Sequence, residues 1–220
     1  MMMTKRYLFL FLVLIFSFES YSQYYKDQNY FVGGSIGYQF PLGDFGDQAN
    51  GGPNFRLTVR KMLNKKLSVG AELSFSLLGQ DKFWDGSHLG SYDVNYNIGS
   101  ALLRASYYFD AWDRDFRPYA SLAFGYFYYR NEIDYTASSL GSSNSKRTIT
   151  ENKVGLTPNI GFLYHISDTW SFDMNLRYTF IPNFPDSVTA KDEYGEDYSY
   201  YLGFDKISLP ELSIGFFYRF

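Results

Sequence analysis

Apolar and polar residues alternate with a period of two along much of this chain, most clearly in its last stretch, 207–220. One face of that stretch carries Pro210, Leu212, Ile214, Phe216, Tyr218 and Phe220, and the other carries Leu209, Glu211, Ser213, Gly215, Phe217 and Arg219. Successive side chains of a β-strand point to opposite faces. The pattern therefore predicts a strand with one apolar face and one mixed polar face.

The same alternation recurs in earlier segments and predicts an all-β chain. We expect strands at 30–42, 53–63, 66–78, 96–109, 116–130, 153–166, 170–181 and 207–220. Long connections (43–52, 79–95, 131–152 and 182–206) alternate with short turns (64–65, 110–115 and 167–169). This alternation is typical of barrels that cross a membrane with strands. The expected fold is a single eight-stranded antiparallel up-and-down transmembrane β-barrel.

A soluble alternative is a secreted β-sandwich or a lipocalin-like barrel, in which the apolar faces turn inward. The opposite faces would then meet water, but they contain glycines and few charges, which makes a poorly solubilised surface. A helical membrane protein is excluded, because no stretch after residue 22 is apolar for the ~18 residues that a spanning helix needs. The pattern therefore favours lipid outside the barrel and polar side chains within it.

The aromatic content supports a barrel in lipid. Phe, Tyr and Trp make up 21% of the chain, yet the mean hydropathy is only -0.27. A membrane barrel reconciles the two values, since only alternate strand residues face lipid. Rings near the expected membrane boundaries predict two girdles. One girdle would contain Phe109, Tyr164, Trp170, Tyr218 and Phe220, and the other Phe40, Tyr126, Tyr128, Tyr178 and Phe180.

The first 22 residues have the layout of a secretory signal peptide. Lys5 and Arg6 form a basic start, 7–18 is an apolar run, and Ser20-Tyr21-Ser22 is a small-x-small cleavage site before Gln23. We expect residues 1–22 to be removed and 23–220 to form the barrel domain. The remaining chain has 18 basic and 22 acidic residues, and this mild acidity argues against a nucleic-acid partner. The absence of cysteine excludes disulfides, thiolate metal sites and a lipid-modified cysteine anchor.

Charged residues on the inward faces are the first candidate site. They are Arg56, Arg60, Glu72, Arg104, Asp173, Arg177, Glu211 and Arg219. We expect Glu72 to pair with Arg104 on one side and with Arg56 or Arg60 on the other, and Asp173 and Arg177 to face Arg219 and Glu211. Buried charges pair because isolated ones are costly, so a structural network is expected over a conducting or proton-handling path. The small inward residues Ser121, Ala123 and Gly125 also suit a narrow lumen.

Enzymatic chemistry finds little support in the sequence. Only two histidines exist, His88 in a long loop and His165 near the end where the termini are expected. No HExxH, GxSxG or phosphate-binding glycine loop is present. We therefore expect no catalytic residues, no cofactor and no dedicated metal site.

The last long connection is a candidate recognition surface. It interleaves carboxylates with rings, and the candidate contact residues are Tyr194, Tyr198, Tyr200 and Tyr201. Tyrosine supplies contact area at low entropic cost, and clustered carboxylates can hold divalent cations together with lipopolysaccharide. A merely solvated acidic loop is the alternative. The connection has no EF-hand spacing, which argues against a dedicated calcium site.

The chain resembles the small outer-membrane β-barrel proteins of Bacteroidota-type bacteria, within a superfamily that includes OmpA-like and OmpW-like barrels. The resemblance covers nearly all of 23–220. The residues that carry it are the signal end Ser22-Gln23, the strand exit Pro41-Leu42-Gly43-Asp44-Phe45, the strand opening Arg117-Pro118-Tyr119, the 161–178 hairpin with Trp170 and Leu176-Arg177-Tyr178, and Phe220. It implies the bacterial outer membrane with both termini periplasmic.

The resemblance also implies partners and a broad role. Tyr218 and Phe220 would form the assembly signal read by the barrel assembly machinery, and the barrel would contact outer-membrane lipid and lipopolysaccharide. Eight strands enclose little space and the inward charges occupy it, so we expect a non-enzymatic protein with a filled polar lumen. Its role would be structural or a surface interaction through its extracellular loops, with an extracellular or periplasmic protein partner. A narrow conduit for small or hydrophobic solutes is the alternative, because such barrels serve several functions.

Overall fold

The computed structural model describes residues 30–79, 83–84, 90–109, 115–137, 145–185, 187–191 and 197–220. The expected signal peptide and its cleavage site lie outside these ranges. The elements are β1 (Tyr30–Gln39), η2 (Gly43–Phe45), β2 (Gly52–Met62), β3 (Leu67–Gly79), β4 (Phe83–Trp84), β5 (Gly90–Tyr108), β6 (Phe116–Ala137), β7 (Ser145–His165), β8 (Trp170–Ile181), β9 (Ser187–Lys191), β10 (Asp197–Tyr201) and β11 (Ile207–Arg219). Among the described residues, no helix has the length and apolar character to cross a membrane.

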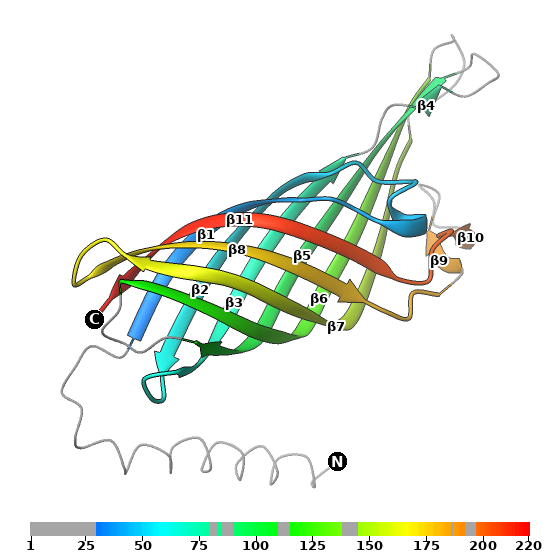
Figure 1. The fold of residues 1–220 in the computed structure, drawn as a ribbon. Helices are drawn as coiled ribbons and strands as arrows, with labels where there is room; N and C mark the ends of the chain where they lie inside the picture. Colours follow the sequence, from blue (N-terminus) through cyan, green and yellow to red (C-terminus); the bar gives the residue numbers. More distant parts are fainter. Residues whose placement is uncertain are drawn as a thin grey trace, which may run out of the picture.

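Eight of these strands close into one antiparallel barrel (Figure 1). Around the barrel the order is β3, β2, β1, β11, β8, β7, β6 and β5, and pairing between β5 and β3 completes the circle. The first and last strands are neighbours, with Phe31 opposite Arg219 and Gln39 opposite Glu211. Each strand therefore has two barrel neighbours and no exposed barrel edge, which confirms the expected fold class.

Short turns lie at the same end of the barrel as Tyr30 and Phe220 (Figure 1). In the β2–β3 turn, the Asn64 side-chain oxygen accepts hydrogen bonds from the backbone N–H groups of Lys66 and Leu67, at 2.8 and 2.9 Å. In the β7–β8 turn, Ser167 Oγ accepts the Trp170 N–H at 3.1 Å. Such local side-chain acceptors are a physical reason for Asn and Ser at tight turns. We call this end of the barrel the terminal end and the opposite end the loop end.

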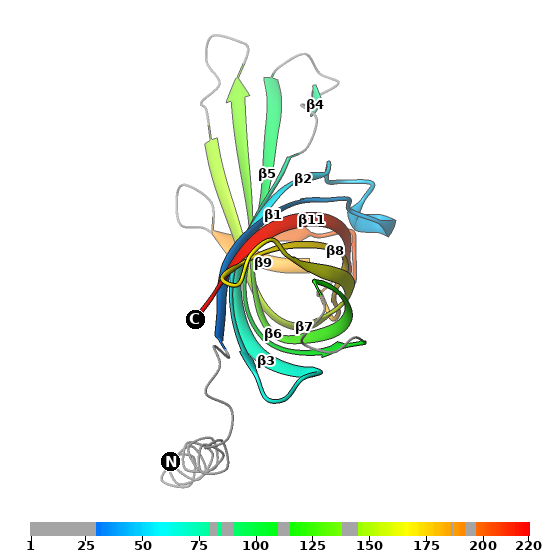
Figure 2. The ribbon, with the colours of Figure 1, turned by 60° about the vertical axis from the view of Figure 1, so that its left-hand side comes forward.

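Three strands extend far beyond the rest at the loop end (Figure 2). We expected loops at 79–95 and 131–152, but β5 begins at Gly90, β6 continues to Ala137 and β7 begins at Ser145. The expectation of loops was therefore wrong for 90–95, 131–137 and 145–152, because polar residues on the outward face masked the alternation. Inside, β5 keeps apolar residues at every second position, as with Val94, Tyr96 and Ile98.

The other connections at the loop end also contain ordered structure. The connection at 182–206, expected to be a loop throughout, contains a two-stranded sheet of β9 and β10. The first connection, 40–51, contains the 3-10 turn η2, and Leu42 bridges to Ser208 of β11. Asn183 adopts a left-handed conformation with φ of 63°, which Asn tolerates better than most residues. These connections therefore lie against the barrel mouth.

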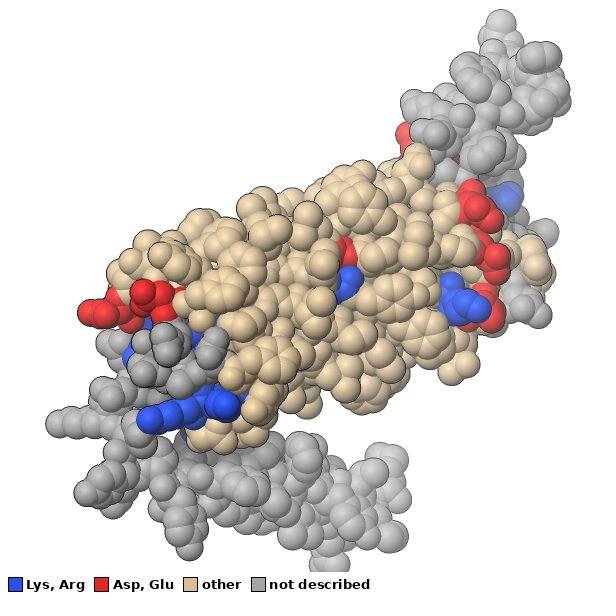
Figure 3. Space-filling view, viewed as in Figure 1, with Lys and Arg blue, Asp and Glu red and all other residues tan. Residues whose placement is uncertain are grey.

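The outward faces form a belt of apolar side chains around the barrel. Figure 3 shows charged residues gathered at the two ends, with a largely uncharged band between them. In the two expected aromatic girdles Phe180 is half-buried, and the exposed fraction of the other side chains runs from 41% at Tyr178 to 64% at Tyr126. At the terminal end, Trp170 packs edge-on against Tyr218, with ring centroids 5.3 Å apart. This outer surface is one that lipid would solvate better than water.

Candidate functional site in the barrel interior

The inward faces meet in a buried layer of charges near the middle of the barrel, which we call the middle layer. Its members are Arg56, Arg60, Glu72, Arg104, Asp173, Arg177 and Glu211, and each is at most 5% exposed. Four arginines thus face three carboxylates. The expected inward placement follows from strand alternation, but the identity of the partners depends on which strands lie across the lumen.

Glu72 on β3 is held by two arginines from different strands. Arg104 on neighbouring β5 donates from Nη1 to Glu72 Oε2 at 2.6 Å, which is one of the expected pairs. The second partner is Arg177 on β8, whose Nη2 lies 2.9 Å from Oε1. We expected Arg56 or Arg60 in that place, which was wrong. The β3–β8 pair crosses the barrel interior, whereas the sequence reveals only strands that are neighbours along the chain.

Glu211 on β11 binds Arg56 on β2, although β1 runs between these two strands. Arg56 Nη1 lies 3.1 Å from Glu211 Oε1, and Gln39 on β1 donates to Oε2 at 3.0 Å. The pair can pass over β1 because Gly37 has no side chain there, and a Cβ would lie 2.6 Å from Glu211 Oε1. Glu211 does stand opposite Arg177 in the β8–β11 register, as expected, but its ion pair is with Arg56.

The Asp173 carboxylate on β8 accepts hydrogen bonds from three different side chains. Arg60 on β2 contacts Oδ2 at 3.3 Å, and the Tyr119 hydroxyl on β6 donates to Oδ1 and Oδ2 at 3.0 and 2.9 Å. Asn175 adds a third donor from its side-chain amide. The Arg60 guanidinium also lies 4.1 Å from the centre of the Phe217 ring. A buried carboxylate with this many donors keeps its charge satisfied without water.

Arg219 does not belong to the middle layer. It lies at the terminal end of β11, half-buried and opposite Phe31, eight residues beyond Glu211. Our expectation that Arg219 faces Asp173 was therefore wrong, because Asp173 stands opposite Gly215, four residues and about 13 Å from Arg219 along the strand. Arg60 takes that place instead.

Sequence reasoning missed two large inward-facing residues of β6, Arg117 and Tyr119. Arg117 on β6 is fully buried, donates to the Lys65 carbonyl at 2.8 Å and lies over the Tyr108 ring, 4.3 Å from its centroid. Tyr119 also faces inward, so the inward face of β6 is not small throughout. Both positions follow from Ser121 by strict alternation toward the start of β6. The signal was therefore present in the sequence.

Apolar side chains fill the interior at the terminal end, which we call the terminal-end layer. It contains Phe31, Met62, Tyr108, Tyr119, Leu163 and Phe217. Beside it, His165 Nδ1 lies 2.7 Å from Ser171 Oγ, but Ser171 is only 1% exposed and so presents no accessible nucleophile. His88 lies outside the described residues.

A larger apolar cluster occupies the loop end, which we call the loop-end layer. Phe45 of η2 is fully buried at its centre, with its ring centroid 5.0 Å from Phe204 and 5.4 Å from Tyr96. Phe184 packs against Phe204 at 5.2 Å. Gln48 ties the first connection to the last by donating to the Leu202 carbonyl at 2.9 Å. Side chains from β5, β6 and two connections therefore meet across the barrel mouth.

The remaining candidate residues lie on the surface or outside the described ranges. Tyr194 is outside them, Tyr198 and Tyr200 are placed in β10 by their backbone, and Tyr201 is 73% exposed. At the terminal end, Phe220 exchanges backbone hydrogen bonds with Tyr30, and its ring stacks on those of Tyr30 and Tyr218. Within the described ranges, no group of three or more His, Asp or Glu could hold a metal ion.

Comparison with solved structures shows that this barrel fold recurs in bacterial outer membranes. OprG from Pseudomonas aeruginosa is 20% identical, with 89% of this chain and 97% of that chain covered and a TM-score of 0.50. Ail, the attachment invasion locus protein of Yersinia pestis, is 13% identical, with 88% and 99% covered and a TM-score of 0.50. The outer membrane protease OmpT of Escherichia coli is 8% identical, with 92% and 100% covered and a TM-score of 0.54.

At these identities the similarity concerns the fold alone, and a protease shares it, so the fold does not decide activity. Comparison with curated protein sequences found no match. The narrower expectation of a Bacteroidota-type barrel stays a prediction. A family model described as the outer membrane protein beta-barrel domain matches residues 8–220, nearly the whole chain. The chain therefore belongs to the outer membrane protein β-barrel family, which implies a location in the bacterial outer membrane.

Proposed function

We propose that this protein is a non-enzymatic outer-membrane barrel with a filled lumen, whose role is structural or is exerted through contacts made by its loop end. The observation that carries the proposal is the stacking of three buried layers. The terminal-end layer, the ion-paired middle layer and the loop-end layer succeed one another along the interior. An eight-stranded barrel has an interior about wide enough for side chains, so these layers leave little room for solute.

The proposed orientation places both termini in the periplasm and the loop end outside the cell. The support is that short turns lie at the terminal end and the longer connections at the other, as in outer-membrane barrels generally. The extension of β5, β6 and β7 would then stand clear of the membrane. Its outward face is polar, with Arg130 and Glu132 joined in an ion pair and Thr148 and Thr150 exposed.

The extension is also the best surface for a partner protein. Pairing of β7 with β8 begins only at Leu156, so the part of β7 before that residue pairs with β6 alone in the described sheet. A strand edge without a sheet partner favours contact with another chain, and β9 covers only part of this one. The name of Ail concerns attachment and invasion, and a surface role for the present chain is a proposal by analogy of fold.

A photo-crosslinking amino acid tests the surface role. It would replace the exposed Thr148 of the extension in living cells, with a matched probe at Leu122 in the apolar belt as control. We expect a discrete protein adduct from position 148 that is absent from position 122. Adducts of the same size from both positions, or none from position 148, would argue against contacts made by the extension.

The alternative function is a narrow conduit for small or hydrophobic solutes. The loop-end layer favours a hydrophobic solute over an ion, because the side chains that meet there are mainly aromatic and aliphatic. This function requires the first and last connections to move apart, since Phe45 is fully buried between them. Conductance of the unmodified barrel tests whether the lumen is open to ions and small polar solutes.

A further inference from the structure

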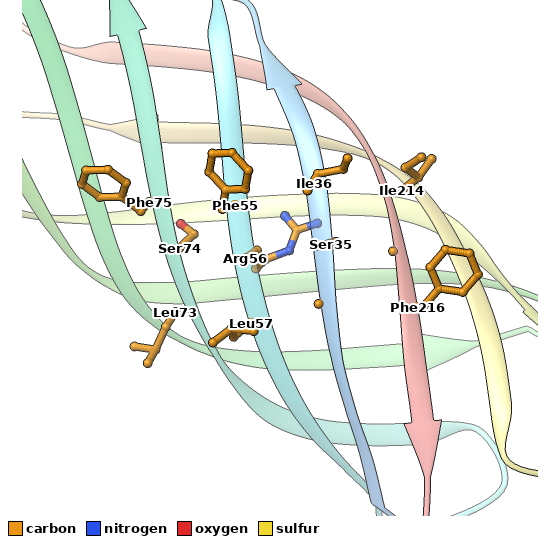
Figure 4. Close-up of a pocket in the computed structure, with 12 residues that line it drawn as sticks. Ser35, Ile36, Phe55, Arg56, Leu57, Leu73, Ser74, Phe75, Ile214 and Phe216 are labelled. Carbon is orange, nitrogen blue, oxygen red and sulfur yellow. The ribbon is translucent and has the colours of Figure 1, made fainter.

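A hollow lies on the outer wall of the barrel, where β11, β1, β2 and β3 run side by side (Figure 4). It is open to the outside and has a volume of about 600 Å³. Its outward-facing walls are Ile36, Phe55, Leu57, Leu73, Phe75, Ile214 and Phe216. These side chains form two rows across the strands (Figure 4). In the second row, Gly34 pairs with Phe216 on one side and with Leu57 on the other, and it interrupts the row because it has no side chain. The hollow therefore exists because one position of the belt has no side chain.

Packing within the protein does not require glycine at position 34. A Cβ there would meet its nearest neighbours, the Arg56 carbonyl oxygen and Leu57 Cδ2, at 3.8 and 3.9 Å, which is ordinary van der Waals contact. At Gly33, on the inward face, a Cβ would lie 2.3 Å from the Phe216 carbonyl oxygen. The inner glycine is therefore needed by the fold, whereas the outer one keeps a space open toward the membrane.

The level of the hollow within the membrane limits what can enter it. Gly34 is flanked on the outward face of β1 by Val32 and Tyr30 toward the terminal end and by Ile36, Tyr38 and Phe40 toward the loop end. It thus lies near the middle of the apolar belt, where a bilayer offers hydrocarbon and no headgroups. A volume of this size falls in the range of small-molecule sites, about 300 to 1,000 Å³. The fitting occupant is a hydrocarbon chain.

A basic residue marks where the headgroup of such a lipid would lie. Lys61 stands on the same face of β2 as Leu57, four residues nearer the terminal end, and its Nζ lies 5.3 Å from the centre of the Tyr30 ring. Four residues of strand span about 13 Å, which at the usual strand tilt of about 40° is about 10 Å of membrane depth. Half the hydrocarbon core of a bilayer is about 15 Å thick. The flexible lysine stem extends its ammonium group over the remaining distance toward the lipid phosphates at the membrane surface.

We propose that the Gly34 hollow binds one acyl chain of a glycerophospholipid whose phosphate contacts Lys61. The proposal rests on the orientation proposed above, in which the terminal end faces the periplasm, because phospholipid forms that leaflet and lipopolysaccharide the outer one. A second copy of the chain fits less well. A twofold dimer would bring the same patch of both subunits together, and two hollows facing each other bury little surface.

Native mass spectrometry of the barrel extracted in mild detergent tests the proposal, with phosphatidylethanolamine and lipopolysaccharide offered together. Gly34→Leu fills the hollow, Lys61→Gln removes the phosphate contact, and Ala71→Leu is the matched control at another small outward-facing position, outside the hollow. The unmodified barrel should retain one phosphatidylethanolamine. Gly34→Leu and Lys61→Gln should each lower the retained fraction several-fold, while Ala71→Leu leaves it unchanged.

Retention by Gly34→Leu equal to that of the unmodified barrel would overturn the proposal, and so would an equal loss in Ala71→Leu. Retained lipopolysaccharide would overturn the phospholipid source, and a dimer lost only in Gly34→Leu would point to a second copy. Heat-dependent electrophoretic mobility verifies that each variant is folded, and Gly34→Val replaces Gly34→Leu if that variant does not fold. Failure of the surface role would appear in the Thr148 crosslinks and leave lipid retention unchanged, so the two proposals fail separately.

Discussion

The middle layer and the loop-end layer occupy the same interior but are stabilised in opposite ways. In the middle layer, Glu72, Asp173 and Glu211 are buried with arginines from other strands. In the loop-end layer, Phe45 is buried among rings and aliphatic side chains. Burying charge costs free energy unless each group is paired, whereas burying a ring is favourable in itself. The middle layer therefore depends on the pairing of opposite charges, and the loop-end layer depends on close packing of apolar side chains.

The two layers also differ in what they connect. The ion pairs join strands across the barrel, such as β3 with β8, and so involve the barrel wall itself. Phe45 and Gln48 join one connection to another above the wall. Loss of a middle-layer charge should therefore destabilise the whole barrel. Loss of a loop-end ring should loosen only the mouth.

The largest effect is expected for Glu72→Gln, which keeps the shape of the side chain but removes its charge. Arg104 and Arg177 would both lose their carboxylate, and breaking a buried ion pair typically costs about 3 to 5 kcal/mol. Urea unfolding in lipid vesicles, followed by the mobility difference between folded and unfolded barrel, measures this loss.

The matched control is Glu151→Gln on β7. Glu151 Oε2 lies 3.1 Å from Lys153 Nζ, and both side chains are partly exposed, so less than about 1 kcal/mol should be lost. Equal losses in the two variants would mean that the middle layer is well hydrated and that its pairs are weak.

A smaller and more local effect is expected for Phe45→Ala. Removing a buried phenyl ring typically costs about 3 to 5 kcal/mol, but here the cost falls on closure of the barrel mouth, so the free energy of unfolding of the whole barrel should change less. The first connection, 40–51, should become sensitive to protease while the strands stay folded. Phe40→Ala, which removes an exposed ring from the girdle, is the control and should leave the cleavage rate unchanged. Global unfolding of Phe45→Ala, or no added cleavage, would contradict the division between the two layers.

Sequence patterns predicted most of the barrel wall and only part of its interior. Alternation places Arg56, Glu72 and Glu211 inward, because a strand leaves only two directions for a side chain. It does not say which residue lies across the lumen, so the Glu72–Arg104 pair between neighbouring strands was predicted and the Glu72–Arg177 pair was not. The latter depends on barrel closure, which brings β8 opposite β3.

The loop-end layer was missed for a different reason. Along 93–98, polar residues at odd positions give the segment the composition of a loop, while Val94, Tyr96 and Ile98 continue the inward series. Beyond the apolar belt the two faces exchange character, with polar residues outside and apolar residues inside, as in a soluble sheet. A search for alternation that ignores which face is apolar would have extended β5 to its observed start. Phe45 and Phe204 offered no such pattern, since both lie in connections.

Planar-bilayer recording of the unmodified protein is the most direct test of a filled lumen. We expect small or absent currents, which grow only when middle-layer arginines such as Arg104 and Arg177 are truncated to alanine. Truncation should open a path because both side chains are buried against Glu72 in the centre of the barrel. Large, steady and weakly selective conductance from the unmodified barrel would contradict the filled lumen and favour the conduit.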